Sequence, residues 1–347
     1  MKYVAVNRDT ATFQRPLDDR QVVALCRHAL GVTPRQWRLI TAGKFNTSYH
    51  IEFDDHPPVV LRIAPPSDAI IFQHERSLLR REAEVQQQLC AVSGKIPRNL
   101  FADFSRALID RDYVFQPCLP GVLWEDVKDQ LSEVENDALW RQFGTIVKAI
   151  HTTPGRRFGQ PAPGQGCDRW SDAIISWVAG MVADLARYQC PRDDARYFLQ
   201  LVEAHRDCLD EVVRPTLVHG DLWLKNILIE RLDGTANISA VLDAERAFWG
   251  EPSAEWIFSF LDIPRSFWGQ YGCLPTGRAA KIRNSIYEGR GAIQLCLEAW
   301  RFHFDDGFAR RNLRRAIATL EAEQSDYDPS VGRGSVAGAP EELAGLT

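Results

Sequence analysis

The stretch Val218-His219-Gly220-Asp221-Leu222-Trp223-Leu224-Lys225-Asn226 places polar side chains between apolar ones, and Asp243 follows Asn226 after seventeen positions. Asp221 and Asn226 are close enough to share one tight loop. The apolar segments 227–229 and 238–242, with Gly234 between them, predict a β-hairpin. Asp243 would then stand at the end of the second strand, which returns it toward the loop that carries Asp221.

These three polar groups match the arrangement used for phosphoryl transfer. In kinases, one carboxylate orients the acceptor hydroxyl, while an asparagine and a second aspartate hold magnesium. By this match Asp221 is the candidate catalytic base, and Asn226 and Asp243 are the candidate Mg²⁺ ligands. The competing interpretation is that they only form turns beside two ordinary strands. The complete spacing favours the catalytic interpretation.

Further segments surround these three residues: His219-Gly220-Asp221-Leu222, Asn226-Ile227-Leu228, Leu242-Asp243-Ala244-Glu245-Arg246-Ala247 and Gly250-Glu251-Pro252. Together they resemble the segments of a known family, the aminoglycoside phosphotransferases, which are small-molecule kinases. The resemblance implies an α+β, two-lobe protein-kinase-like fold with an N-terminal antiparallel sheet lobe containing one helix and a larger, mainly helical C-terminal lobe. It also implies ATP and Mg²⁺ as cofactors, with GTP as the alternative, and a hydroxyl acceptor.

The motifs depart from those of protein kinases in a way that indicates a small acceptor. Gly220 stands where protein kinases have arginine, and Ala244-Glu245 stands where they have Phe-Gly. Because the resemblance is to that family and the predicted acceptor rim is acidic, an antibiotic of aminoglycoside type is the first expectation, and a sugar, amino alcohol or amino acid is the metabolic alternative. A protein kinase is disfavoured. A non-catalytic pseudokinase is disfavoured too, because Asp221, Asn226 and Asp243 are all present.

The N-terminal part can be compared with the nucleotide lobe of such an enzyme. Segments 37–40 and 47–53 are predicted strands on either side of Thr41-Ala42-Gly43-Lys44-Phe45-Asn46. This loop would cover the phosphates. Because it has a single glycine, the candidate nucleotide contacts are backbone N–H groups and the residues Gly43, Lys44, Asn46 and Thr47. An ordinary hairpin is the alternative.

The next strand, 59–63, carries Arg62 at the position where the resemblance places a phosphate-binding lysine. Arginine keeps the positive charge and adds a bidentate fork suited to carboxylate or phosphate. Lys44 is the alternative cation. A helix predicted at 74–89 places Glu82 as the partner of the strand cation. The alternative for Glu82 is a surface pair with a neighbouring arginine.

A connector between the lobes is predicted at 113–121, where two prolines and a glycine follow a strand. Gln116 and Cys118 are the candidate adenine contacts in this hinge, through their backbone groups. The predicted domains are 1–116 for the nucleotide lobe, 117–327 for the catalytic and acceptor lobe and 328–347 for a disordered tail. Helices are predicted at 18–30, 132–151 with a Ser132–Glu135 capping box, 170–188, 193–213, 279–303 and 308–321.

An acidic rim with one aromatic residue is the candidate acceptor site. Its negative charge would attract a polycationic acceptor, although a solvated acidic face is the alternative. Trp249 and Trp268 are equally consistent with core or pocket, and His151 and His219 are expected to support the scaffold. The candidate acceptor-binding residues are Glu245, Glu251, Glu255, Trp256, Asp262 and Glu298.

Composition limits the other classes of function. A net charge of −5, from 41 basic and 46 acidic residues, argues against a nucleic-acid partner. No apolar stretch is long enough to span a membrane, so a cytoplasmic protein is expected. The eight cysteines have no C-x-x-C spacing, which is typical of reduced thiols.

Overall fold

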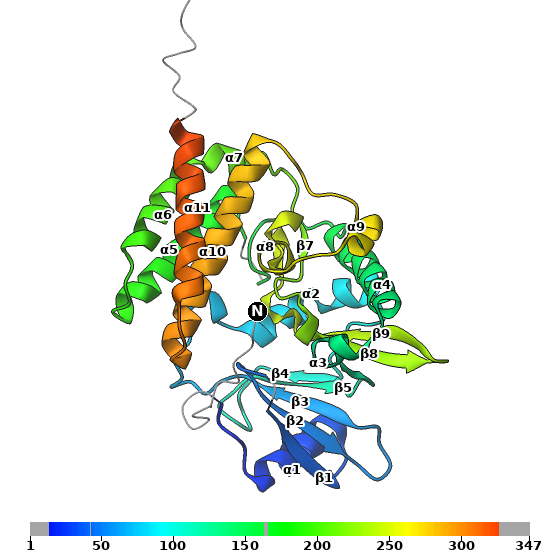
Figure 1. Ribbon diagram of the computed structural model, residues 1–347. Helices are drawn as coiled ribbons and strands as arrows, with labels where there is room; N and C mark the ends of the chain where they lie inside the picture. The colour runs from blue at the N-terminus through cyan, green and yellow to red at the C-terminus, as the bar shows by residue number, and fades with distance from the viewer. Residues whose placement is uncertain (1–13, 42, 163–165, 326–347) are drawn as a thin grey trace, which may run out of the picture.

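A five-stranded antiparallel sheet forms the lower lobe in the computed structural model, which describes residues 14–41, 43–162 and 166–325 (Figure 1). The predicted tail at 328–347 lies outside the described residues. Strand predictions at 37–40, 47–53 and 59–63 are confirmed to within a residue. In spatial order the strands are β1 (Gln36–Ile40), β2 (Thr47–Glu52), β3 (Val59–Ile63), β5 (Tyr113–Pro117) and β4 (Phe101–Asp103).

Alternation along β3 gives the two faces of this sheet different roles. Leu61 packs with Leu25 and Cys26 of α1 (Asp19–Leu30) in one apolar cluster. Because successive side chains in a strand point to opposite faces, Arg62 points the other way, toward the rest of the protein. The side chain of Asp18 caps α1 by accepting from the backbone N–H of Gln21 at 2.8 Å.

Helix α2 (Leu78–Val92) lies between the sheet and the helical lobe (Figure 1). It buries Glu82 toward the sheet, while Val85 and Leu89 join the core of the larger lobe. The helix begins four residues later than predicted. A short 3-10 helix, η1 (Gln73–Glu75), comes first, and Ser77 with φ 58° then interrupts the helical path.

A three-stranded sheet carries the polar loop that follows β7 (Thr216–Val218). The strands are β6 (Val122–Leu123), β8 (Ile227–Leu232) and β9 (Thr235–Val241) in the order β6-β8-β9. Asp233 and Gly234 connect β8 to β9 with φ of 50° and 78°. Two positive φ values define the type I′ turn that Asp-Gly pairs favour. The predicted hairpin and its turn are confirmed.

Helices build the rest of the larger lobe, and α5, α6, α10 and α11 pack side by side in it (Figure 1). The Ser132–Glu135 capping box is present at the start of α4. The segment predicted as one helix at 193–213 is divided at His205, whose Nε2 lies 3.1 Å from the Leu320 carbonyl. The helices are α3 (Trp124–Val127), α4 (Glu133–His151), α5 (Trp170–Arg187), α6 (Asp193–Ala204), α7 (Arg206–Asp210), α8 (Trp256–Phe260), α9 (Arg265–Tyr271), α10 (Arg278–Phe302) and α11 (Gly307–Ser325), with the 3-10 helices η2 (Lys128–Gln130), η3 (Leu224–Asn226), η4 (Ala244–Arg246) and η5 (Pro252–Ala254).

Among the described residues, no helix is both long and apolar enough to cross a membrane. The eight cysteines are free thiols.

Candidate active site

The loop that carries Asp221 is fixed at both ends by short strands. It leaves β7, which pairs with β10 (Phe248–Gly250), and it enters β8 through η3. Gly220 has φ +80°, and a Cβ at this position would lie 2.3 Å from the carbonyl oxygen of Arg246. Both the backbone conformation and the close approach require glycine here. The chain after Asp243 is therefore packed directly against the chain before Asp221.

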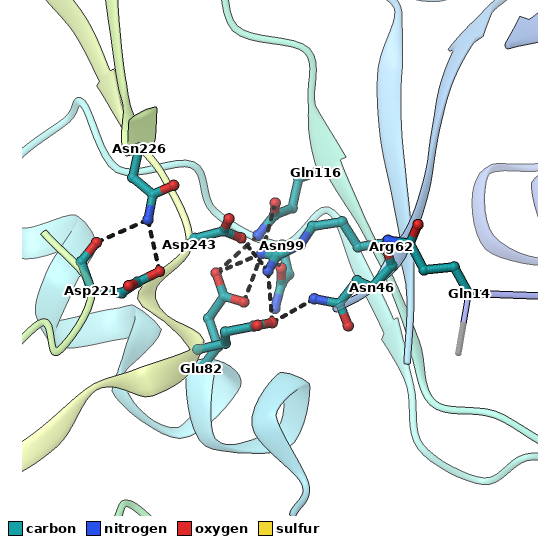
Figure 2. Close-up of polar contacts among 10 residues, drawn as sticks. Gln14, Asn46, Arg62, Glu82, Asn99, Gln116, Asp221, Asn226 and Asp243 are labelled. Atoms are coloured by element: carbon teal, nitrogen blue, oxygen red, sulfur yellow. Dashed lines mark hydrogen bonds and ion pairs between the residues drawn. The ribbon is translucent and has the colours of Figure 1, made fainter. Parts of the chain in front are cut away.

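Asp221 and Asn226 contact each other within this loop, as their spacing predicted. The Asn226 side-chain amide donates to the backbone oxygen of Asp221 at 2.8 Å and to its carboxylate at 2.9 Å (Figure 2). Burial raises the pKa of Asp221 well above its usual range; Arg246 opposes this shift and Asp243 adds to it. A carboxylate held in this way can accept a hydrogen bond from a hydroxyl placed beside it.

Asp243 directly follows Leu242 at the end of β9. It has φ 62° and ψ 52°, an uncommon backbone conformation for a residue with a side chain. The backbone N–H of Leu242 donates to the carbonyl oxygen of Asn226 at 2.8 Å, which ties the two segments together. The structure thus brings Asp243 to the loop of Asp221 and Asn226.

Arg62 is the centre of an ion-pair cluster between the lobes (Figure 2). Its guanidinium lies 2.8 Å from Glu82, 2.6 Å from Asp243 and 2.9 Å from Glu245. The side chains of Arg62, Glu82 and Glu245 are no more than 7% exposed, whereas Asp243 is 42% exposed. The predicted Arg62–Glu82 pair is therefore present, and Glu82 is not a surface residue.

One guanidinium facing three carboxylates leaves this cluster with excess negative charge. Burial alone would lower the pKa of Arg62, but Glu82, Asp243 and Glu245 together raise it above its ordinary value. Burial raises the pKa of Glu82 and of Glu245, and Asp243 adds to both shifts while Arg62 opposes them. Additional positive charge near Asp243 would therefore stabilise the ionised cluster.

The donor set around Asp243 fits magnesium. No group of three or more His, Cys, Asp or Glu side chains within 14–41, 43–162 and 166–325 is arranged to hold a metal ion. Mg²⁺ is usually held by one or two carboxylates together with substrate phosphates. The amide nitrogen of Asn226 is used by Asp221, so its oxygen is turned away from Asp221 (Figure 2). That oxygen and the Asp243 carboxylate suit an ion that arrives with a nucleotide.

The glycine-poor loop is tied to this cluster through Asn46. The Asn46 amide donates to Glu245 at 2.5 Å, and Gln14 donates to the backbone oxygens of Asn46 at 2.8 Å and Gly43 at 3.0 Å. The Thr47 hydroxyl is directed at the Arg15 carbonyl, at 3.5 Å. Lys44 lies 5.9 Å from the ring centre of Phe304, outside the Arg62 cluster. Of the two candidate cations, Arg62 is the one paired with Glu82.

The hinge candidates lie at the end of β5. The buried Gln116 side chain donates to Asn99 at 3.0 Å, and its oxygen lies 3.5 Å from the Arg62 guanidinium. Gln116 therefore helps to hold Arg62 in place. The backbone N–H of Cys118 donates to the Pro58 carbonyl at 3.1 Å. That N–H is therefore occupied, and the predicted adenine contact through it is not supported. Asn99 and Gln14 were missed by sequence reasoning, because polar residues outside motifs carry no recognisable spacing.

Glu255 has a structural position instead of the predicted rim position. It is fully buried, and its carboxylate accepts from the backbone N–H groups of His219 at 2.9 Å and Gly220 at 3.0 Å. His151 Nε2 lies 3.3 Å from the same carboxylate. Glu255 therefore holds the start of the loop that carries Asp221, and the two histidines belong to this scaffold.

The other predicted rim residues are divided in the structure. Glu251 is buried, pairs with Arg283 at 3.0 Å and accepts from Tyr287, so the rim prediction is wrong for Glu251 and Glu255. Glu245 belongs to the Arg62 cluster. Glu298, Asp262 and Trp256 stay predictions. Glu298 lies 3.4 Å from Arg246, Asp262 is exposed, and the Trp256 ring lies tilted against Phe260 at 4.4 Å between ring centres. Trp249 and Trp268 pack against the core.

Replacing Glu255 by glutamine is expected to lower the free energy of unfolding by about 2–3 kcal/mol at pH 7. The substitution removes charge-assisted hydrogen bonds, and the new side-chain NH₂ group would face backbone N–H donors that it cannot satisfy. Burial alone would raise the pKa of Glu255, but the hydrogen bond and charge of His151 and the N–H of Gly220 hold it below its ordinary value. A depressed folded-state pKa gives stability that is present above the unfolded value of about 4.3 and is lost as the pH falls through the folded value.

Urea unfolding at pH 7 and at successively lower pH measures this dependence. The difference between wild type and Glu255→Gln should narrow as the pH falls below about 4.3, whereas Glu203→Gln, an exposed glutamate on α6, should match wild type throughout. A difference that stays constant with pH would contradict the assignment.

A sheet lobe and a helical lobe, with an aspartate–asparagine loop and a second aspartate between them, define a kinase-like phosphotransferase with a hydroxyl acceptor. The sequence profile of the Phosphotransferase enzyme family (APH) matches residues 36–272. The chain belongs to this family.

Solved structures of aminoglycoside phosphotransferases share the fold. A thermostable mutant of APH(4)-Ia, with ADP and hygromycin B, superposes with a TM-score of 0.60 at 19% identity over 86% of this chain and 98% of that one. The GDP and kanamycin complex of APH(2″)-IIIa gives a TM-score of 0.56 at 15% identity over 88% of this chain and 98% of that one. No curated protein matches in a sequence search.

Proposed function

We propose that this protein transfers the γ-phosphoryl group of a nucleoside triphosphate, ATP in the first instance, to a hydroxyl of a small molecule. The observation that carries the proposal is the single cluster in which Asn226 donates to Asp221 while Arg62 contacts both Glu82 and Asp243. A proton acceptor, two oxygen ligands and a fixed cation are the groups that phosphoryl transfer requires.

Each residue has a defined task in this reaction. Asp221 orients the attacking hydroxyl and accepts its proton, and Asn226 keeps the carboxylate in place. Arg62, aligned by Glu82, binds the phosphates, and Asn46 with the backbone of its loop covers them. Mg²⁺ held by Asn226 and Asp243 would neutralise charge on the β- and γ-phosphates. We propose that residues 1–116 form the nucleotide lobe and 117–327 the acceptor lobe, in a cytoplasmic enzyme.

Different observations favour two classes of acceptor, aminoglycosides and metabolic small molecules. The aminoglycoside predicted from the sequence is supported by the neighbours solved with hygromycin B and kanamycin. A metabolic acceptor is favoured by the absence of Glu251 and Glu255 from any exposed rim, since the buried carboxylates cannot receive ammonium groups. The test must therefore include both classes.

Release of ADP from Mg-ATP, measured with aminoglycosides, sugars, sugar acids, amino alcohols and amino acids, tests the proposal. We expect at least one class to stimulate ADP release by wild type and by Asp129→Asn, an exposed control on η2, but not by Asp221→Asn. Bound nucleotide without stimulation by any class would instead support the pseudokinase alternative.

A further inference from the structure

A narrow cavity opens beside the candidate base. Its wall includes Gly220, which directly precedes Asp221, and its empty space is about 420 Å³, part of it open to solvent. Trp177 of α5 and Phe248 of β10 form an apolar side. A group bound here would therefore lie next to the position at which an acceptor hydroxyl meets Asp221.

The polar side of the cavity is basic. Arg81 from α2, Arg246 from η4 and Arg290 from α10 line it together with His74, and no carboxylate lines it among the described residues. Burial is the main cause that lowers the pKa of Arg81, His74 and Arg290. The charge of Arg246 lowers each of these pKa values further, so the four side chains share one electrostatic environment. This is the opposite of the acidic acceptor site predicted from the sequence.

Among the described residues, Arg246 is the one arginine of this cavity that has carboxylates in ion-pair range. Glu75 is already paired with Arg301, at 2.5 and 2.8 Å, and lies 3.8 Å from Arg246. Glu298 is 3.4 Å from Arg246. Within the described part of the chain, neither Arg81 nor Arg290 has a carboxylate in ion-pair contact. The cavity keeps a net positive charge.

Arg81 and Arg290 are therefore cations with no carboxylate in direct ion-pair contact among the described residues. Burial lowers the pKa of Arg81 to about 10, and the charge of Arg246 adds to the shift. Burial likewise lowers the pKa of Arg290 to about 10, although Tyr287 and Glu255 oppose the shift. Arg81 donates to the backbone oxygen of His74 at 2.8 Å, which satisfies a hydrogen bond but not a charge.

Unused hydrogen-bonding groups line the same cavity. The His74 side chain is 7% exposed, and neither ring nitrogen has a hydrogen-bond partner in the described structure, although Nε2 lies 4.0 Å from the Glu75 carboxylate. The Nε of Arg290 is buried without a partner there as well. The guanidinium of Arg290 lies 5.5 Å from the ring centre of Trp177 and 5.7 Å from that of Phe248. Stacking on rings stabilises the charge but leaves the in-plane N–H donors available.

We propose that the acceptor of this phosphotransferase carries an anionic group, a carboxylate or a phosphate, that binds in the cavity of Arg81, Arg246 and Arg290. This inference rests on the proposed function. Arginine forks suit planar and tetrahedral oxyanions, and an oxyanion would supply acceptors to the unpartnered Arg290 and His74 nitrogens. An ammonium group close to one of these guanidiniums would be repelled.

Equilibrium binding tests the inference without requiring turnover. The probes are D-gluconate, D-glucose 6-phosphate, D-glucose and D-glucosamine, then D-glycerate beside glycerol, and finally kanamycin. Isothermal titration without nucleotide should show wild type binding an anionic member at least about tenfold more tightly than its neutral or cationic counterpart. Comparison of gluconate with glucose 6-phosphate distinguishes carboxylate from phosphate.

Variants of Arg290 test whether the cavity causes the preference for anionic probes. Arg290→Met, which retains apolar contact with Trp177 and Phe248, should lose about 10- to 100-fold in affinity for the anionic probe, and Arg290→Lys should recover part of it. Arg187→Met is the matched control, because this exposed arginine stacks on Tyr188 away from the cavity. It should bind like wild type.

The outcomes separate this inference from the proposed function. A preference for neutral or cationic probes, or failure of every anionic probe to bind, would overturn the inference, even if kanamycin stimulated ADP release. Anion binding that Arg290→Met weakens, without ADP release by any compound, would support the inference as a statement about binding and overturn the phosphotransfer assigned to the site.

Discussion

Replacement of Asp221 by asparagine is expected to lower kcat by about 10²- to 10⁴-fold while leaving the nucleotide Kd within a few-fold of wild type. The amide cannot accept the proton of the attacking hydroxyl. The groups proposed to contact the nucleotide are Arg62 and Asp243 above all. Arg62 pairs with Glu82, Asp243 and Glu245, and none of these ion pairs includes Asp221. The loss should therefore fall on the chemical step.

The fold should survive this substitution. Asparagine has nearly the same shape, and its carbonyl oxygen can accept the hydrogen bond that Asn226 donates to Asp221 at 2.9 Å. Removing a carboxylate that is desolvated and close to Asp243 also removes repulsion. The melting temperature in the absence of nucleotide should therefore equal or exceed that of wild type. Steady-state rates, nucleotide titration and thermal unfolding together separate a catalytic effect from misfolding, and unchanged kcat would contradict the assignment of the base.

The part of the site that sequence could predict is the part built from local spacing. Asp221 and Asn226 are five residues apart in one loop, which brings their side chains into contact. The Asp233-Gly234 turn returns β9 to the same loop, so the hairpin by itself places Asp243 there. Ser132 and Glu135 likewise specify a helix start within four residues. These features depend on backbone geometry over short distances, which residue types determine strongly.

What sequence could not predict is the direction in which charged side chains point. Glu251 and Glu255 follow Asp243 closely in the sequence and were therefore predicted to line the acceptor site. Both side chains are instead buried: Glu251 pairs with Arg283, and Glu255 accepts from a backbone N–H of the loop that carries Asp221. Partners so distant in sequence leave no local pattern. The strands β4, β7 and β10 also escaped prediction, since three residues are too few to show a period of two.

The sequence does contain a pattern that indicates the basic cavity: two arginines stand on apolar faces of helices. Arg290 lies four residues after Ile286 and three before Ile293, on the apolar face of α10, and Arg81 lies between Leu78 and Val85 of α2. A cation at a position where periodicity calls for an apolar side chain indicates either a buried ion pair or a ligand. The structure offers neither Arg81 nor Arg290 a carboxylate partner within the described residues.

Replacing Arg62 by methionine is expected to abolish nucleotide binding at micromolar concentrations and to lower the free energy of unfolding by about 3–5 kcal/mol at pH 7. Methionine fills similar space, but Glu82, Asp243 and Glu245 would then face one another without the shared cation. Removing one member of a buried ion-pair cluster leaves the remaining buried charges without their counter-ion. Loss of fold and loss of nucleotide affinity are thus expected together.

Further variants separate charge from geometry at Arg62. Arg62→Lys keeps one charge but not the fork that reaches three carboxylates, so it should retain nucleotide binding and recover only part of the stability.

Lys44→Met should weaken nucleotide binding much less than Arg62→Met, because Lys44 lies over Phe304 and not on Glu82. Arg38→Met, an exposed arginine on β1, is the matched control. Nucleotide titration and urea unfolding of all four proteins measure both effects. If Lys44→Met lost the nucleotide while Arg62→Met kept it, the phosphate-binding cation would be Lys44, and the buried cluster would serve only to hold the two lobes together.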